Sequence, residues 1–149
     1  MRSSFAELEP FLSWVSAGHD VAESLAFIER SRESWAKGTE FNYAILTADD
    51  EFAGSIGLMT RMGPGILEIG YWMGTAHAGR GYTTAAVRAL TSVALTLPDA
   101  GRLVICHDVA NAASAAVARK AGYVETARVA RDPQAPGDTG TDVVRDYRP

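Results

Sequence analysis

The chain has 149 residues, of which 47% are hydrophobic and 21% charged, and its formal net charge is −4. This length and composition fit a single folded domain over residues 1–149 and argue against wholesale disorder. The negative charge gives no sign of a nucleic-acid footprint, and we expect neither a signal segment nor a membrane span. The single cysteine, Cys106, excludes an internal disulfide, so we expect a reducing, cytoplasmic location.

The first half of the chain reads as two helices followed by a strand hairpin. Residues 5–15 and 21–35 repeat apolar side chains at helical spacing, and Asp20 is in place to cap the second helix. Residues 41–47 and 52–60 have the composition of strands and are separated by a short acidic turn. These segments predict two helices that precede the first hairpin of a sheet.

The second half alternates strands with helices. After the predicted strand 66–73 come a glycine-bearing turn and a long helix that ends near Pro98. The remaining predicted elements are strand 102–107, helix 112–121, strand 123–130 and strand 141–147. The crossover from strand 66–73 to strand 102–107 is long enough for a parallel, right-handed unit. The sequence therefore predicts an α+β fold, with a mixed, mostly antiparallel sheet, one central parallel strand pair and flanking helices.

The turn before the long helix is the first candidate site. It reads AGRGYTT from Ala78 to Thr84 and lies where helix amides lack intrahelical partners and the helix dipole is positive. Gly79 and Gly81 let the backbone approach a phosphate, and Arg80 adds a cation. We therefore expect an anion site here. On local grounds, a glycine turn that only caps the helix is the alternative.

Nucleotide-binding motifs compete for the same turn. The triphosphate motif G-x-x-x-x-G-K-[ST] is absent from the sequence. A G-x-G is present, but the third glycine of the dinucleotide motif would fall at Thr84. Asp108, at the end of the next strand, stands where a ribose-binding acid could lie, so a dinucleotide-binding module stays open as a rival.

A second motif, N-x-x-S-x-x-V-x-x-K-x-G-Y, begins at Asn111. Together with the strand ending IGYW and the turn AGRGYTT, it resembles the GNAT acetyltransferases, and most closely their ribosomal-protein N-terminal acetyltransferase branch. The resemblance extends over residues 4–147. It implies transfer of an acetyl group from acetyl-CoA to a primary amine, with no metal, and favours the N-terminal α-amine of a protein or peptide.

The resemblance also assigns cofactor-binding residues. Strand 66–73 would pair with the pantetheine amides, the turn would hold the pyrophosphate, and the start of helix 112–121 would lie beside the thioester. These residues are Ile69, Tyr71, Trp72, Met73, Ala78, Gly79, Arg80, Gly81, Tyr82, Thr83, Thr84, Asn111 and Ser114. Ala78, Thr83 and Ala85 depart from the residues common in the family, which bears on affinity more than on identity.

Two residues are candidates for the chemistry of acetyl transfer. An α-amine, with a pKa of about 7.8, is partly neutral near neutral pH, so it needs only a weak base. Glu68, the one acid in strand 66–73, is the candidate base; a solvated charge on an open sheet face is the alternative. Ser114 is the candidate donor to the departing thiolate; holding a water is the alternative. Tyr123 and Cys106 are better explained as core residues.

Besides the dinucleotide-binding module, three functions remain open on these grounds, and transfer of acetyl to the N-terminal α-amine of a protein or peptide is the first of them. A small-molecule acetyltransferase, acting on an amino acid, polyamine or aminoglycoside, is the alternative within enzymes. A catalytically silent acyl-CoA-binding protein is the alternative outside them.

The sheet edge carries a separate expectation. Members of the family open with a strand that this sequence lacks, so strand 41–47 would be an exposed, apolar edge without a charge, proline or bulge to protect it. We therefore expect either an upstream start or coverage by a partner subunit, such as a homodimer, or by a swapped segment.

Overall fold

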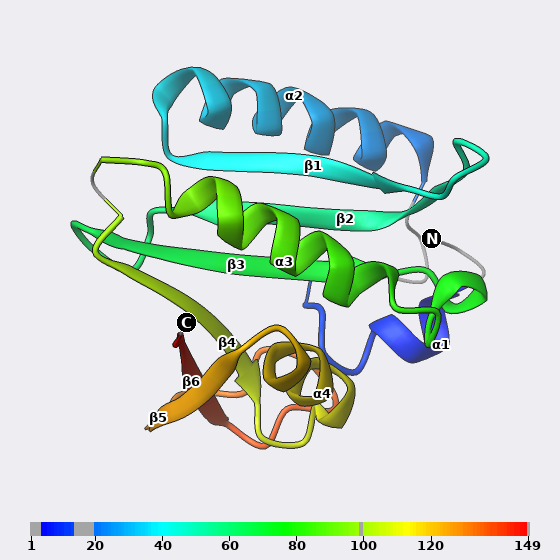
Figure 1. Ribbon diagram of the computed structural model, residues 1–149. Helices are drawn as coiled ribbons and strands as arrows, with labels where there is room; N and C mark the ends of the chain where they lie inside the picture. The colour runs from blue at the N-terminus through cyan, green and yellow to red at the C-terminus, as the bar shows by residue number, and fades with distance from the viewer. Residues whose placement is uncertain (1–3, 14–19, 99, 149) are drawn as a thin grey trace.

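The computed structural model describes residues 4–13, 20–98 and 100–148. They form a six-stranded sheet in the order β1-β2-β3-β4-β6-β5, with helices on both sides (Figure 1). The elements are α1 (Phe5–Leu8), α2 (Val21–Lys37), β1 (Glu40–Leu46), β2 (Phe52–Met59), β3 (Ile66–Met73), η2 (Thr75–His77), α3 (Tyr82–Ala94), β4 (Arg102–Asp108), α4 (Ala112–Lys120), β5 (Tyr123–Ala130) and β6 (Thr141–Tyr147).

The two N-terminal helices differ in how well the sequence predicts them. The start of α2 is a capping box in which Asp20 accepts from the Glu23 amide and Glu23 accepts from the Asp20 amide, as the sequence suggested for Asp20. The first helix is shorter than predicted and ends at Leu8. Pro10 explains this, because a proline removes an amide donor and disfavours helical geometry in the residue before it.

The sheet topology confirms the predicted fold class. β3 and β4 are the parallel pair and occupy the centre of the sheet, and every other neighbouring pair is antiparallel. The parallel pairing is short, running from Ile66 opposite Arg102 to Glu68 opposite Val104. Beyond it, β3 and β4 diverge, so the centre of the sheet splits at its carboxyl end.

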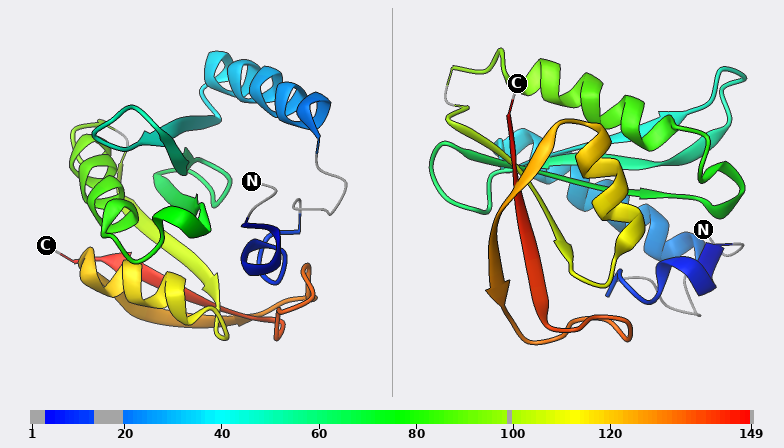
Figure 2. Two further views of the ribbon diagram at one scale, coloured as in Figure 1. Left: turned by 90° about the vertical axis from the view of Figure 1, so that its right-hand side faces the viewer. Right: turned by 60° about the horizontal axis from the view of Figure 1, so that its bottom comes forward.

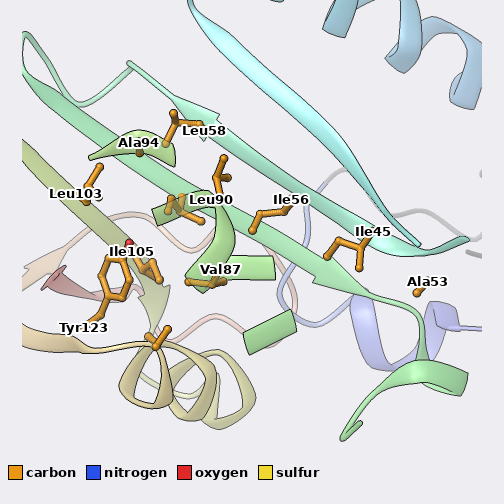
Figure 3. Close-up of a cluster of buried hydrophobic side chains, with 13 residues drawn as sticks. Ile45, Ala53, Ile56, Leu58, Val87, Leu90, Ala94, Leu103, Ile105 and Tyr123 are labelled. Atoms are coloured by element: carbon orange, nitrogen blue, oxygen red, sulfur yellow. The ribbon is translucent and has the colours of Figure 1, made fainter. Parts of the chain in front are cut away.

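The core lies between the sheet and helices α3 and α4, whereas α1 and α2 lie toward the other face (Figure 2). Val87 and Leu90 of α3 pack against strand residues such as Ile56 and Ile105 (Figure 3). Tyr123 is 1% exposed, and its hydroxyl lies 2.7 Å from the Thr91 hydroxyl. Its predicted role as a core residue is confirmed.

Cys106 is only half-buried, which differs from the expected core position. On β4 it alternates with the core residue Ile105 and therefore faces the opposite side of the sheet. Burial raises the pKa of its thiol to about 12, so the thiol stays protonated near neutral pH. A protonated thiol is a poor nucleophile, so Cys106 has no catalytic role in this state.

β1 is a sheet edge, as expected, because within the described residues it pairs with β2 alone. It is less open than its sequence suggested. Trp35 of α2 packs edge-on against Phe41 and Tyr43, with ring centroids 5.2 and 5.0 Å apart, and Ile45 is buried. The pairing also shifts register between Ile45 and Leu46, so the edge carries an irregularity that the sequence did not reveal.

Candidate functional site

A large cavity occupies the split in the sheet. Its volume is about 1790 Å³, and it reaches from the glycine turn and the start of α4, past the diverging ends of β3 and β4, to the face flanked by α1 and α2. The split lets one cavity open on both faces of the sheet.

The glycine turn presents free amides to this cavity. Gly79 and Gly81 have φ values of 74° and 83°, in the left-handed region that favours glycine. The first bond of α3 runs from the Ala85 amide to the Gly81 carbonyl, and within the described residues the amides of residues 79–84 donate to no protein group. A Cβ at either glycine would meet no protein atom within 4 Å, so the space in front of the turn is open. This arrangement suits an anion.

The divergence of β3 from β4 also exposes part of the strand backbone. Residues 69–71 of β3 continue to pair with β2 on one side, but within the described residues they have no pairing with β4 on the other. An extended ligand that carries amides can bind such an edge as an added strand. The free edge leads from the glycine turn toward the start of α4.

Asn111 and Ser114 lie at the start of α4. The Asn111 side chain accepts from the Ser114 amide at 3.0 Å and caps the helix. The Ser114 hydroxyl lies 2.9 Å from the hydroxyl of Tyr71, which also donates to the Ser114 carbonyl at 3.1 Å. Burial raises the pKa of Tyr71 to about 12. The sequence placed Tyr71 by its backbone alone and gave no signal of this contact.

Glu68 lies on the other face of β3, opposite in direction to Tyr71. It is 3% exposed, so the alternative of a solvated charge is wrong. Its two carboxylate oxygens accept from Nε and Nη2 of Arg61 at 2.6 and 2.8 Å. This hydrogen bond raises the pKa of the Arg61 guanidinium. The pairing fixes the carboxylate beside the cavity and leaves further lone pairs on both oxygens.

Asp108 does not fit the role of a ribose-binding acid. It is 4% exposed, and its carboxylate accepts from the Ala110 amide and from the amide and hydroxyl of Thr139. Burial alone would raise the pKa of Asp108, but these hydrogen bonds outweigh burial and hold it below the usual value. The carboxylate anchors the turn before α4 to the β5–β6 loop. Asp108 is therefore not available to bind a ribose, which argues against the dinucleotide-binding alternative.

The remaining predicted residues line or flank the same cavity. Trp72 packs edge-on against Phe52 with ring centroids 5.7 Å apart, and the Tyr82 ring lies 6.3 Å from that of His77. Ile69 and Met73 pack toward the core. The half-buried Thr83 and Thr84 line the cavity, and Ala78 and Arg80 are exposed.

The structure thus brings the predicted residues into one site. No group of three metal-ligating side chains occurs among the residues that the structure describes. Over the same residues, no helix has the length and apolar composition needed to cross a membrane. The open glycine turn, the free β3 edge and the Ser114 hydroxyl define a site for an extended ligand that carries a phosphate at one end.

A family profile described as "Acetyltransferase (GNAT) domain" matches residues 4–124, and the chain belongs to this family. A curated relative, "Putative ribosomal N-acetyltransferase YdaF" of Bacillus subtilis (strain 168), is 40% identical over 65 residues. That match covers 44% of this chain and only 35% of the relative.

Two solved structures show the same fold. The microcin C7 self-immunity acetyltransferase MccE, in complex with acetyl-CoA and AMP, has a TM-score of 0.88 at 20% identity, covering 97% of this chain and 80% of that one. RimL, a ribosomal L7/L12 alpha-N-protein acetyltransferase in complex with coenzyme A, has a TM-score of 0.85 at 22% identity, covering 97% and 82%.

Proposed function

We propose that the protein is an acetyl-CoA-dependent N-acetyltransferase of the cytoplasm that acts on a primary amine, with the N-terminal α-amine of a protein or peptide favoured. One observation carries the proposal: free amides at the glycine turn lie in the same cavity as residues 69–71 of β3, which have no pairing with β4, and as Ser114. Coenzyme A has the matching sequence of parts, namely a diphosphate, an arm with two amides and a terminal sulfur. The name of the Bacillus subtilis relative, a ribosomal N-acetyltransferase, supports the choice of acceptor.

The residues present fit this ligand. The amides of residues 79–84 would hold the diphosphate, with the exposed Arg80 as a nearby cation. The edge of β3 at residues 69–71, beyond the pairing with β4, would pair with the amide-bearing arm. Asn111 and Ser114 would lie beside the sulfur, because α4 begins just after β4 diverges from β3. Acetyl-CoA supplies an acetyl group activated as a thioester.

The amine would enter from the face that carries Glu68. Glu68 would accept a proton from the amine, directly or through a water, and Arg61 would keep the carboxylate in place. The amine nitrogen forms a bond to the acetyl carbon as the bond from that carbon to sulfur breaks, and the proton lost by nitrogen ends on sulfur. Ser114 would donate a hydrogen bond to the sulfur as negative charge develops on it.

The acceptor assignment is tested with acetyl-CoA and a panel of amines, by measuring thiol release. We expect peptides with a free α-amine to be acetylated, and the same peptides with a blocked N-terminus to be inert. We expect the α-amine to be the better acceptor because its pKa of about 7.8 leaves part of it neutral near neutral pH. A lysine amine, with a pKa of about 10.4, is almost fully protonated there. Turnover of polyamines, aminoglycosides or free amino acids alone would establish the small-molecule alternative. Binding of coenzyme A without turnover of any amine would show that the protein is a catalytically silent acyl-CoA-binding protein.

We also propose that a second copy of the chain covers the α2 side of the molecule. Val21, Leu25, Ile28 and Trp35 recur along α2 and are 44–75% exposed. The first turn of α2 carries Glu23 and its last turn Lys37, so antiparallel pairing of two α2 helices would set opposite charges against each other. Size-exclusion chromatography with light scattering is expected to show a dimer. A monomer at high concentration, with β1 amides that exchange rapidly, would contradict this proposal.

A further inference from the structure

The Asn42 side chain lies on the same face of the sheet as Glu68. Asn42 of β1 pairs with Gly57 of β2, Gly57 pairs with Gly70 of β3, and Glu68 is two positions before Gly70 on that strand. Residues paired across two strands share a face of the sheet, and so do residues two positions apart along one strand. The four residues therefore belong to one face, and all of them line the cavity.

Both protons of the Asn42 side-chain amide are used within the protein. Nδ2 donates to Glu40 Oε1 at 2.9 Å and to Ser31 Oγ at 3.1 Å, and Ser31 belongs to α2, which lies along β1 (Figure 1). The Glu40 carboxylate fixes the orientation of the amide, because the opposite orientation would set Oδ1 against a negatively charged oxygen. Oδ1 is left as an acceptor, and no group among the described residues donates to it.

Gly57 makes room for this oxygen on the sheet. A Cβ at Gly57 would lie 2.5 Å from Asn42 Oδ1, well inside the usual separation of nonbonded atoms, so a larger residue would displace the amide. Asn42 is only half-buried, although Ser31 and Glu40 hold its nitrogen. The result is a carbonyl oxygen fixed in direction, at the wall of a cavity, without a donor from the described residues. Such an oxygen is suited to accept from an N–H of a ligand.

The oxygen lies about as far from Glu68 as one residue of a peptide can bridge. Strands are about 4.8 Å apart and each residue advances about 3.4 Å, so Gly57 and Glu68 are about 8 Å apart. An amine nitrogen held at Glu68 by a hydrogen bond of about 2.9 Å is followed by the next peptide nitrogen about 3.5 Å further on. A second hydrogen bond of the same length brings the span to about 9 Å. The nitrogen of a third residue would lie too far along the chain.

We propose that Asn42 is an acceptor-binding residue: its Oδ1 accepts from the first peptide N–H of the substrate, while the α-amine of that substrate lies at Glu68. This inference rests on the proposed function and deepens it. The site then requires an amide N–H one residue after the amine, a group that proteins and peptides have and that polyamines and free amino acids lack. A peptide with proline as its second residue also lacks this proton and should be a poor acceptor.

The test compares two acceptors, a peptide and the same chain with an ester in place of its first peptide bond. The ester keeps the α-amine but has no proton to donate to Oδ1. We expect Asn42→Leu to lower kcat/KM for the peptide about 5- to 10-fold and not to lower it for the ester, so that the peptide-to-ester ratio falls by at least that factor. Differences that belong to the acceptors, such as the pKa of the amine, are common to both proteins and cancel in this comparison.

A second variant moves the oxygen without removing it. Gly57→Ala keeps Asn42 but displaces its amide, so the same ratio should fall in the same direction. The matched control is Thr60→Val, which removes a side-chain hydrogen bond to the Thr39 carbonyl just beyond the paired ends of β1 and β2. Thr60 does not line the cavity, so this variant should leave the ratio unchanged.

The outcomes separate this inference from the proposed function. Equal losses of kcat/KM for peptide and ester in Asn42→Leu would overturn the role of Asn42 and leave the function intact. A fall of the ratio in Thr60→Val as large as in Asn42→Leu would also overturn it, because any disturbance of the hairpin would then have the same effect. If the unaltered protein acetylates no α-amine, the proposed function fails and this inference fails with it.

Discussion

Gly81→Val is expected to remove most of the stabilisation that coenzyme A gives the protein. At a free ligand concentration about 100-fold above Kd, binding should add about 2.7 kcal/mol to the unfolding free energy, which corresponds to a rise in Tm of about 5–10 °C. A Cβ at Gly81 would meet no protein atom within 4 Å, so the free protein has room for a larger side chain at this position of the turn. That space is where a diphosphate would approach the amides, so the variant should melt at nearly the same temperature with and without ligand.

Gly38→Val is the matched control. Gly38 follows α2 with a φ of 69°, and a Cβ there would also meet no protein atom within 4 Å, so it shares the left-handed backbone and the open surroundings of Gly81. Both valines impose the same kind of backbone strain, about 1–2 kcal/mol. Gly38→Val should lower the Tm of the free protein yet keep the full shift with coenzyme A. If millimolar coenzyme A fails to shift even the unaltered protein, the cofactor assignment is wrong.

The order and type of the elements were predictable because each rests on local signals. β3, β5 and β6 occupy the predicted residues, and β4 extends one residue beyond the prediction, to Asp108. The glycine turn was predictable for the same reason, since the left-handed backbone at Gly79 and Gly81 is a property of the residue type. The length of the first helix was not predictable in this way. The apolar spacing of residues 5–15 continues across Pro10, but the helix ends before the proline, at Leu8.

The side-chain contacts of the site could not be predicted because they depend on pairing between distant segments. Arg61 lies in the turn between β2 and β3, and it reaches Glu68 since the antiparallel register sets Met59 opposite Glu68. Tyr71 and Ser114 meet because β3 and β4 pair over a few residues and then diverge. Nothing in either local sequence encodes where that pairing ends. The ring of His77 is partly enclosed, and its Nδ1 is buried with no hydrogen-bond partner among the described residues.

Glu68→Gln is expected to lower kcat by a factor of about 100 or more on the true acceptor, with the affinity for acetyl-CoA unchanged. The amide is nearly the same size as the carboxylate but cannot take up a proton from the amine. The ion pair with Arg61 gives a second explanation for a loss of rate in Glu68→Gln. Both oxygens of Glu68 accept from Arg61, so the substitution also breaks a half-exposed ion pair, and displacement of β3 would lower kcat without any catalytic role for the carboxylate.

Arg61→Gln separates the two explanations. It breaks the same ion pair from the other side, and the Arg61 side chain is 67% exposed, so its removal leaves no large cavity. If Glu68 is the base, Arg61→Gln should lower kcat far less than Glu68→Gln does, because the carboxylate loses its anchor but stays on β3 and can still take up the proton. Glu68→Gln alone should then lose the rate, while thermal shifts with acetyl-CoA stay equal in both variants. Equal losses of kcat would instead assign Glu68 to holding β3 against the β2–β3 turn, and the amine would have to lose its proton to water.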